Sequence, residues 1–168
     1  MAVRESGDGL DKLMQAINFM NSSKVCVGIP QENAQRSSKN GMTNVALAYI
    51  HSKGSPRMHI PARPFIEPGV ESKRDEIAAE MYNAALAAIE GDMGSANGHL
   101  DAAGQEGEDG VKAMFGTGAP NAPITIHGGW MRNPVSGKPF YVVGKGSDNP
   151  LINTGALMNS VTHVIRSK

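Results

Sequence analysis

The sequence predicts an α+β fold, and three observations carry this prediction. Residues 10–20 repeat apolar side chains at helical spacing, residues 24–29 form a short apolar run that ends at Pro30, and residues 160–165 alternate like a strand. The chain has 168 residues, which is the length of one domain, and its 40% hydrophobic residues suffice for a core. We therefore expect a single domain over residues 1–168, with helices early and in the middle.

Composition excludes several classes of protein. Sixteen basic and sixteen acidic side chains give zero net charge, which argues against a nucleic-acid binder held by bulk charge. The single cysteine, Cys26, excludes an intramolecular disulfide and a cysteine-based zinc site, and we expect its thiol to be unreactive if it is buried. No apolar run approaches the length of about 20 residues that a membrane-spanning helix needs. The N-terminus also lacks the apolar core of a signal peptide.

The first expected helix spans residues 10–20, and either Ser6 or Asp8 serves as its cap. Residues 31–42 are polar with no apolar face, which predicts an exposed, flexible loop that orders only on docking to a partner. The apolar stripe of the helix consists of Leu10, Leu13, Met14, Ile17 and Met20.

Two further helices are expected before the middle of the chain. One spans residues 44–53, with Thr43 as its cap and Gly54 just past its end. The other is long, beginning at Pro68 and ending at Gly91. Its expected buried stripe is Ile77, Met81, Ala84, Ala85, Ala88 and Ile89.

The glycine-rich segment of residues 91–118 is expected to form an interrupted helix. It carries eight glycines, and each glycine inside a helix costs about 1 kcal/mol relative to alanine. Beyond it we expect a strand at 124–126, turns at 128–130 and 134–137, and a second strand at 140–143. A turn or short helix is expected within 151–160.

No constellation in the sequence predicts an active site, a metal site or a cofactor. The histidines lack metal-binding spacing, and the run at 144–147 lacks the first glycine and the following helix of a phosphate-binding loop. Ser160 and His163 would face opposite sides of a strand. The acidic group at 106–109 lies in glycine-rich sequence, which we expect not to hold carboxylates at a fixed separation.

Charge is distributed unevenly along the chain. Residues 92–109 contain acids but no Lys or Arg, whereas six basic residues and only Asp148 as an acid follow from Lys112 onward. This asymmetry favours oppositely charged faces that suit head-to-tail packing of identical subunits. Solvated faces without a partner are the equally weighted alternative, and DNA passing along the basic face is a weaker one.

Three phrases in order carry a resemblance to a known family. They are ALAYIHSKG at 46–54, IPARPFI at 60–66 and PLINTGALMNSVT at 150–162. With them, the sequence resembles the tail-completion proteins of long-tailed bacteriophages, related to minor tail protein Z. It departs from the family at Lys53 and Asn153, where an acid is common. Residues 128–143, which include Trp130, resemble an insertion.

The resemblance implies a compact α+β domain with a small, mostly antiparallel sheet packed by a long helix. It implies a non-enzymatic virion protein, made in the cytoplasm of the bacterial host, that forms a ring, expected to be a hexamer, at the head-proximal end of the tail or within the neck. Its neighbours would be a tail terminator or tail tube protein and a head-closure or adaptor protein. DNA would pass through the ring without sequence-specific binding.

Two other function classes stay open. The chain could itself be the tail terminator or the head-closure protein, since both are small α+β ring subunits. A small enzyme or a regulatory binding module is the third class, and it would require a pocket with convergent polar groups.

Two segments are the candidate interface, and each has a structural alternative. The Pro-rich segment loses little entropy on docking, and the alternative is that Phe65 fills the domain's own core. Thr154 and Gly155 most simply serve as a helix cap and a point of close backbone approach, with partner contact as the alternative. The candidate residues are Ile60, Arg63, Pro64, Phe65, Asn153, Thr154 and Gly155.

Overall fold

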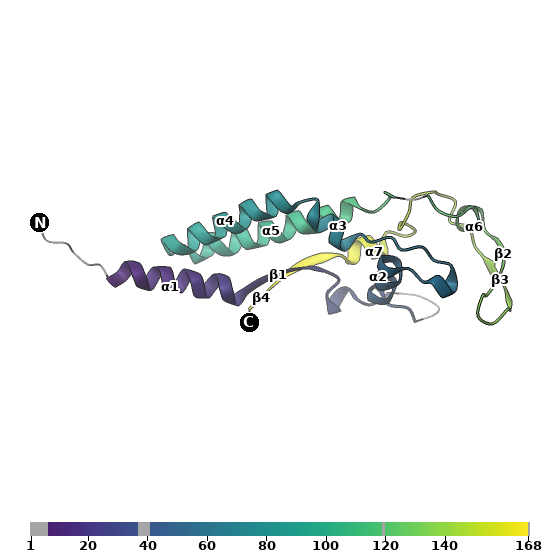
Figure 1. Ribbon diagram of the computed structural model, residues 1–168, viewed down its shortest axis with the longest axis horizontal. Helices are drawn as coiled ribbons and strands as arrows, with labels where there is room; N and C mark the ends of the chain where they lie inside the picture. The colour runs from purple at the N-terminus through teal and green to yellow at the C-terminus, as the bar shows by residue number, and fades with distance from the viewer. Residues whose placement is uncertain (1–6, 37–40, 119, 168) are drawn as a thin grey trace, which may run out of the picture.

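The computed structural model describes residues 7–36, 41–118 and 120–167 (Figure 1). Helices and strands in this part of the chain confirm the α+β class. The molecule is elongated rather than compact: α1 and the α4–α5 pair lie toward one end, and the β2–β3 hairpin forms the other (Figure 1). The elements are α1 Gly7–Ser22, β1 Ser23–Gly28, η1 Gln31–Asn33, α2 Asn44–Lys53, η2 Pro56–Met58, α3 Ile66–Glu71, α4 Arg74–Glu90, α5 Met93–Ala113, α6 Pro123–His127, β2 Gly129–Arg132, β3 Pro139–Val142, α7 Ala156–Ser160 and β4 Thr162–Ser167.

The strands near the two ends of the chain pair with each other. β1 and β4 run antiparallel, with Val27 opposite His163 and Cys26 opposite Val164. Both strands pack on α5. The helix on this small antiparallel sheet is therefore α5, from the glycine-rich segment, and not the long helix expected over residues 68–91. Cys26 is exposed, so its expected protection by burial is absent.

The glycine-rich segment forms one continuous helix, α5, and the expected interruption is wrong. Three of its glycines lie where neighbouring elements approach closely. A Cβ at Gly110 would stand 2.3 Å from the carbonyl oxygen of Gly69 in α3, and one at Gly104 would stand 2.3 Å from the His163 ring. A Cβ at Gly107 would stand 2.9 Å from the Val27 side chain. Because these glycines have no side chain, α3, β1 and β4 can pack closely against α5. This tertiary packing offsets the low helix propensity of glycine.

The long helix expected from Pro68 to Gly91 is divided into α3 and α4. Residues 72–73 separate the two helices. In α3, Gly69 lies directly against the backbone of Gly110 and Val111 in α5. Gly91 ends α4 in the left-handed conformation, as expected. Within the expected stripe, Ala84 and Ala88 are buried, Ile77, Met81 and Ala85 are partly buried, and Ile89 is exposed.

Helix α1 is present, but its apolar stripe is not buried. Its buried residue is Ala16, which packs with Ala87, Ala88 and Ala96. Leu10 is 66% exposed, and Leu13, Met14 and Ile17 of the same stripe are also exposed. Since α1 contacts the rest of the molecule through a different face, no described element covers the stripe. Of the two expected caps, Asp8 lies inside α1 and Ser6 lies outside the described residues.

Helix α2 follows its local sequence signals. The Thr43 hydroxyl accepts a hydrogen bond from the Ala46 N–H at 3.1 Å, and Gly54 follows the last turn with φ +72°. In the described part of the expected loop at residues 31–42, residues 31–33 form η1, and the segment after them is tied to α2. Buried Asn44 donates its side-chain amide to the carbonyls of Asn33 and Gln35. Residues 37–40 lie outside the described part of the chain.

The end of the molecule near residues 120–145 differs most from expectation. Residues 124–126 belong to the one-turn helix α6 rather than to a strand. The carbonyls of Thr125 and Ile126 accept hydrogen bonds from the Lys145 and Gly146 N–H groups, which fixes this turn against the returning chain. The expected insertion, residues 128–143, contains the β2–β3 hairpin, and Trp130 lies in β2 rather than in a turn.

The larger core lies beneath the sheet and the short helices. Phe65, 0% exposed, packs edge-on against Phe115 with 4.9 Å between ring centroids. The expected short helix near the C-terminus is α7, and it contributes buried Leu157. The buried members of this core are Ala48, Phe65, Val111, Phe115, Leu157 and Val161.

Candidate functional site

Five of the seven candidate interface residues line one cavity of about 710 Å³. The cavity lies between α2, the segment after η2, the chain around Asn121 and the segment that leads into α7. The two motif phrases are about ninety positions apart in the sequence, yet both supply its walls. The five residues are Ile60, Arg63, Asn153, Thr154 and Gly155.

The other two candidates lie elsewhere. Pro64 is exposed and does not line the cavity, and its contact with a partner stays a prediction. Phe65 is fully buried in the core against Phe115, so the alternative in which it fills the domain's own core is correct. Its side chain is therefore not available to a partner in this structure.

Local hydrogen bonds position the Arg63 wall. Ser55 and Ile60 exchange backbone hydrogen bonds that close the turn around η2, and the Arg63 N–H donates to the His51 carbonyl at 2.7 Å. The Arg63 guanidinium donates to the Pro120 carbonyl at 3.0 Å. A Cβ at Gly54 would stand 2.7 Å from the Ala62 nitrogen, so glycine is required there for the segment to return past α2.

Lys145 stabilises the opposite wall through backbone carbonyls. Its ammonium donates to the carbonyl of Asn149 and, at 3.0 Å, to that of Ile152. This pair of contacts holds the chain that leads to Gly155, which takes a left-handed conformation with φ +75° at the start of α7. The nearest atom to a Cβ at Gly155 would be 3.8 Å away, so its backbone angle rather than close approach requires glycine.

The cavity is electrically positive. Burial lowers the pKa of His51, and the nearby cations Arg63, Arg36 and Lys145 lower it further. Burial also lowers the pKa of Lys145, and Arg63 adds to this effect while Asp148 opposes it. Both shifts have the direction that converging positive charge and desolvation produce. His51 is therefore neutral at pH 7, beside three charged cations.

Two buried polar atoms beside the cavity lack a hydrogen-bond partner among the described residues. They are Nδ2 of Asn121 and Nδ1 of His51, both on residues that line the cavity. Asn121 is 9% exposed, and its backbone N–H donates to the Asp148 carboxylate at 2.8 Å. An unsatisfied buried donor costs about 1–3 kcal/mol, so a ligand acceptor that reached it would stabilise the complex.

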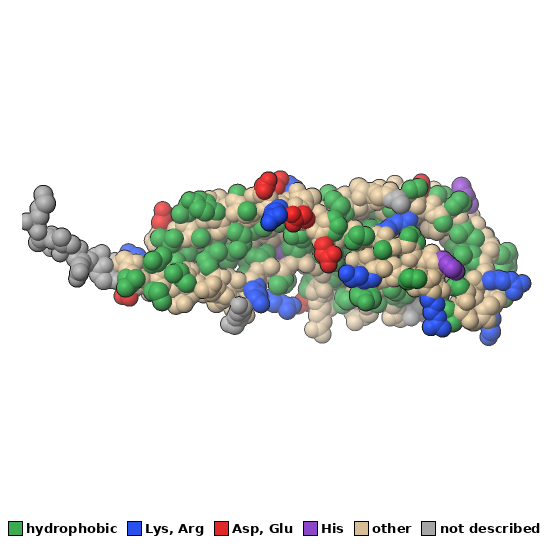
Figure 2. Space-filling view, in the orientation of Figure 1, with side chains coloured by type: hydrophobic (Ala, Val, Ile, Leu, Met, Phe, Trp, Pro, Cys, Tyr) green, Lys and Arg blue, Asp and Glu red, His purple; other side chains and the backbone are tan. Residues whose placement is uncertain are grey.

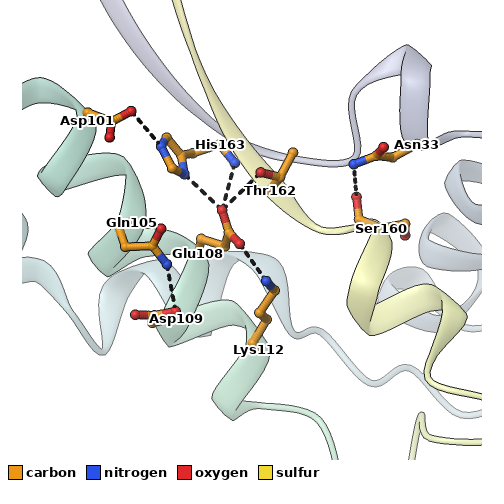
Figure 3. Close-up of polar contacts among 9 residues, drawn as sticks. All are labelled: Asn33, Asp101, Gln105, Glu108, Asp109, Lys112, Ser160, Thr162 and His163. Atoms are coloured by element: carbon orange, nitrogen blue, oxygen red, sulfur yellow. Dashed lines mark hydrogen bonds and ion pairs between the residues drawn. The ribbon is translucent and has the colours of Figure 1, made fainter.

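A second polar cluster joins α5 to β4 (Figure 3). One carboxylate oxygen of Glu108 accepts from the Thr162 hydroxyl, the His163 N–H and the His163 ring at 2.8 Å. The other accepts from Lys112 at 2.5 Å. The remaining ring nitrogen of His163 lies 3.1 Å from Asp101. Because both ring nitrogens face carboxylates, the protonated imidazolium satisfies every contact in the cluster.

This arrangement shifts the pKa values of Glu108 and His163. Burial tends to raise the pKa of Glu108, but hydrogen bonds from Lys112, His163 and Thr162 outweigh it and lower the pKa to about 2. Burial tends to lower the pKa of His163, and its hydrogen bonds to Asp101 and Glu108 outweigh that and raise the pKa. The acceptor groups of Glu108 are engaged with side chains of the protein itself, so we assign this cluster a structural role.

This cluster corrects the expectation that the acidic group at residues 106–109 cannot hold a carboxylate in a fixed position. Glu108 belongs to the group at 106–109, and it is held in place because α5 is a continuous helix despite its glycines. The sequence signal that could have predicted this cluster was the spacing of Asp101, Glu108 and Lys112, which places all three on one face of a helix. Ser160 does not contact the His163 ring in the described hydrogen-bond network; its hydroxyl donates to the Leu157 carbonyl at 2.7 Å.

Charge separates along the molecule. Residues 66–113, which form α3, α4 and α5, contain eleven carboxylates and three Lys or Arg. Residues 24–65 and 114–168 together contain two carboxylates and eleven Lys or Arg. On the face in Figure 2, acidic side chains gather over the helices, and Lys and Arg extend from the end that carries the hairpin.

The β2–β3 hairpin exposes aromatic side chains at the basic end. Trp130 is 73% exposed and packs edge-on against Tyr141 across the two strands, with 5.5 Å between ring centroids. Phe140 and Val143 are exposed beside them. A lone two-stranded hairpin is marginally stable in water, so a partner that covers these side chains would also stabilise the hairpin.

Two further searches cover the described residues. Within residues 7–36, 41–118 and 120–167, no group of three or more His, Cys, Asp or Glu is placed to hold a metal ion. No described helix combines the length and the apolar character needed to cross a membrane.

Comparisons with known proteins found no relative. No protein-family model matches the chain, and neither a curated protein nor a solved structure matches it significantly.

Proposed function

We propose that this chain is a structural virion protein of a long-tailed bacteriophage, a tail-completion or neck component that forms a ring and joins tail to head. The observation that carries the proposal is the convergence of two motif phrases on one cavity. Ile60 and Arg63 come from the first phrase, and Asn153, Thr154 and Gly155 come from the second. The order of the phrases along the chain supports the family resemblance.

The distribution of charge supports a ring of identical subunits. A heterologous interface joins two different surfaces of the same protein, and it closes into a ring when the rotation between subunits closes. The acidic helices α3–α5 of one copy complement the basic end of the next. Zero net charge adds little long-range repulsion to oppose this association.

Exposed apolar side chains support assembly at both ends of the molecule. Leu10 and Met14 on α1 are exposed at one end, and Trp130 and Tyr141 on the hairpin are exposed at the other. Large aromatic side chains contribute strongly when an interface desolvates them. We assign these two surfaces to contacts within the ring and with the tail-side and head-side neighbours.

Deletion of the gene from a phage that encodes this chain tests the proposed level in the virion. We expect DNA-filled heads and complete tails of normal length that fail to join, with infectivity restored by the gene in trans. Overlong tails would instead indicate a tail terminator, and heads that lose their DNA would indicate a head-closure protein. A normal yield of infectious particles would contradict the proposal.

A further inference from the structure

The lining of the cavity contains both cationic and apolar side chains. Arg36, Arg63 and Lys145 line the cavity together with His51, and their positive charges lower the pKa of His51 after burial does. Ile60, Leu151 and Ile152 also line the same cavity. A ligand that fits it must therefore carry negative charge next to apolar atoms.

The polar groups of the cavity are mainly hydrogen-bond donors. The guanidinium groups and the Lys145 ammonium can only donate, and the amide nitrogen of buried Asn121 is a donor without a partner among the described residues. The carboxylate that acts on Lys145 is Asp148, and it already accepts from the Asn121 N–H. No Asp or Glu is among the described residues that line the cavity, so a ligand with acceptors and negative charge complements its three cations.

We propose that this cavity binds an acidic peptide segment of a partner protein, with a side-chain carboxylate at the cations and a neighbouring apolar side chain against the apolar lining residues, such as Ile60 and Ile152. The partner's identity as a virion neighbour rests on the proposed function, whereas the binding itself does not. A peptide suits the site better than a nucleic acid for two reasons. The walls are partly apolar, and phosphate backbones are bound along extended basic surfaces of positively charged proteins, whereas this chain has zero net charge.

The binding is tested on the full chain by two-dimensional ¹H–¹⁵N NMR. The probe is an acetylated, amidated pentapeptide of alternating leucine and glutamate, and its glutamine counterpart is the matched control. We expect the glutamate peptide to shift the side-chain amide signals of Asn121, and to bind about tenfold more tightly than the glutamine peptide. Binding should also raise the pKa of His51, because the bound carboxylate offsets the charges of Arg36, Arg63 and Lys145.

Variants locate the site. Arg63→Gln should weaken glutamate-peptide binding about tenfold, but Arg63 also holds the Pro120 carbonyl and its loss can disturb folding. Arg36→Gln is therefore the second variant, with an expected weakening of about threefold or more. Arg57→Gln is the control, because Arg57 is exposed on η2 and does not line the cavity.

Several outcomes would overturn the inference. They are no shift at millimolar glutamate peptide, equal binding of the glutamine peptide, and equal effects of Arg36→Gln and Arg57→Gln. Tighter binding of a ten-nucleotide oligothymidylate at the same residues would assign the cavity to phosphates instead. Absence of peptide binding together with unjoined heads and tails in the gene deletion would reject this inference alone. Peptide binding together with normal particles from the deletion would reject the proposed function alone.

Discussion

The acidic helical half of the molecule and its basic, short-element half are stabilised in different ways. Helices α4 and α5 lie side by side, and α5 meets α3, β1 and β4 through glycine contacts so close that a methyl group would collide with a neighbour. The basic half depends on turns, prolines and side chains that donate to backbone carbonyls, as Arg63 and Lys145 do. The first half is therefore closely packed around the glycines of α5, whereas the second half contains a cavity and exposed aromatic side chains.

The same contrast holds for the polar clusters. Glu108 in the helical half accepts hydrogen bonds from Thr162, His163 and Lys112, and little of its side chain contacts solvent. In the basic half, Asn121 is buried and lines the cavity with the cations, and its amide nitrogen has no hydrogen-bond partner within the part of the chain that the structure describes. A satisfied buried network stabilises a fold, and a partly satisfied one beside a cavity is a place where a ligand can bind.

The largest expected effect concerns glycine packing in the acidic half. Gly110→Ala places a methyl group 2.3 Å from the Gly69 carbonyl oxygen, so we expect a loss of about 3 kcal/mol in the free energy of unfolding. Gly98→Ala in the same helix is the matched control, because nothing lies within 4 Å of its added Cβ. That control should gain about 0.5–1 kcal/mol through higher helix propensity. Urea unfolding measures both, and equal stability of the two variants would show that α5 is not closely packed.

The next effect concerns the buried carboxylate. Glu108→Gln keeps the shape but removes the charge that Lys112 and His163 face, so we expect a loss of about 2 kcal/mol. Asp109→Asn is the control on the exposed face, where Asp109 accepts from Gln105, and it should change stability by less than about 0.5 kcal/mol. A similar loss in both variants would refute the structural role of the Glu108 cluster.

The pH dependence of stability sharpens the same assignment. The lowered pKa of Glu108 gives a contribution that is present above its ordinary value of 4.5 and is lost as pH falls toward about 2. The raised pKa of His163 gives a contribution that is full below 6.5 and is lost as pH rises through the raised value. The cluster, with Asp101, Lys112 and Thr162 around these two groups, therefore stabilises most between pH 4.5 and 6.5.

The urea midpoint as a function of pH checks this expectation. His163→Gln should remove the loss of stability on the alkaline side, whereas His127→Gln, at an exposed position in α6, should leave it in place. Parallel pH profiles of the wild type and His163→Gln would contradict the assignment.

The smallest expected effect on the isolated chain concerns the hairpin. Trp130→Ala removes an exposed side chain whose described ring contact is Tyr141, so we expect a stability change within about 0.5 kcal/mol. The same variant should reduce joining of heads to tails in a complementation assay, because it removes an aromatic anchor. Wild-type joining by Trp130→Ala would remove the hairpin from the proposed interface.

Local signals predicted the parts of the fold that depend on local chemistry. Thr43 caps the start of α2 and Gly54 follows its end, as their residue types indicate. Strand β1 was predicted from an apolar run, and β4 was predicted from alternating side chains. Helix α5 was missed because the benefit of Gly104 and Gly110 comes from His163 and Gly69, which are distant in the sequence. Propensity counts the cost of a glycine but does not include a close contact that the glycine permits.

The candidate site was predicted in part for the same reason. Ile60 and Arg63 meet Gly155 at the cavity, and motif phrases alone had selected these residues. The cavity cations Arg36 and Lys145 and the buried Asn121 were missed, since no local pattern distinguishes them from surface residues. Phe65 was ambiguous because an aromatic residue between extended segments suits a core and an interface equally well.

The central claim is that this chain acts as a ring subunit whose acidic helices contact the basic end of the next copy. A cryo-electron microscopy reconstruction of the neck in particles that encode the chain tests it most directly. We predict a ring of this protein at the head–tail junction, in which α3–α5 of each subunit face the basic end of its neighbour. A neck without this chain, or a ring in which the acidic helices face one another, would contradict the account.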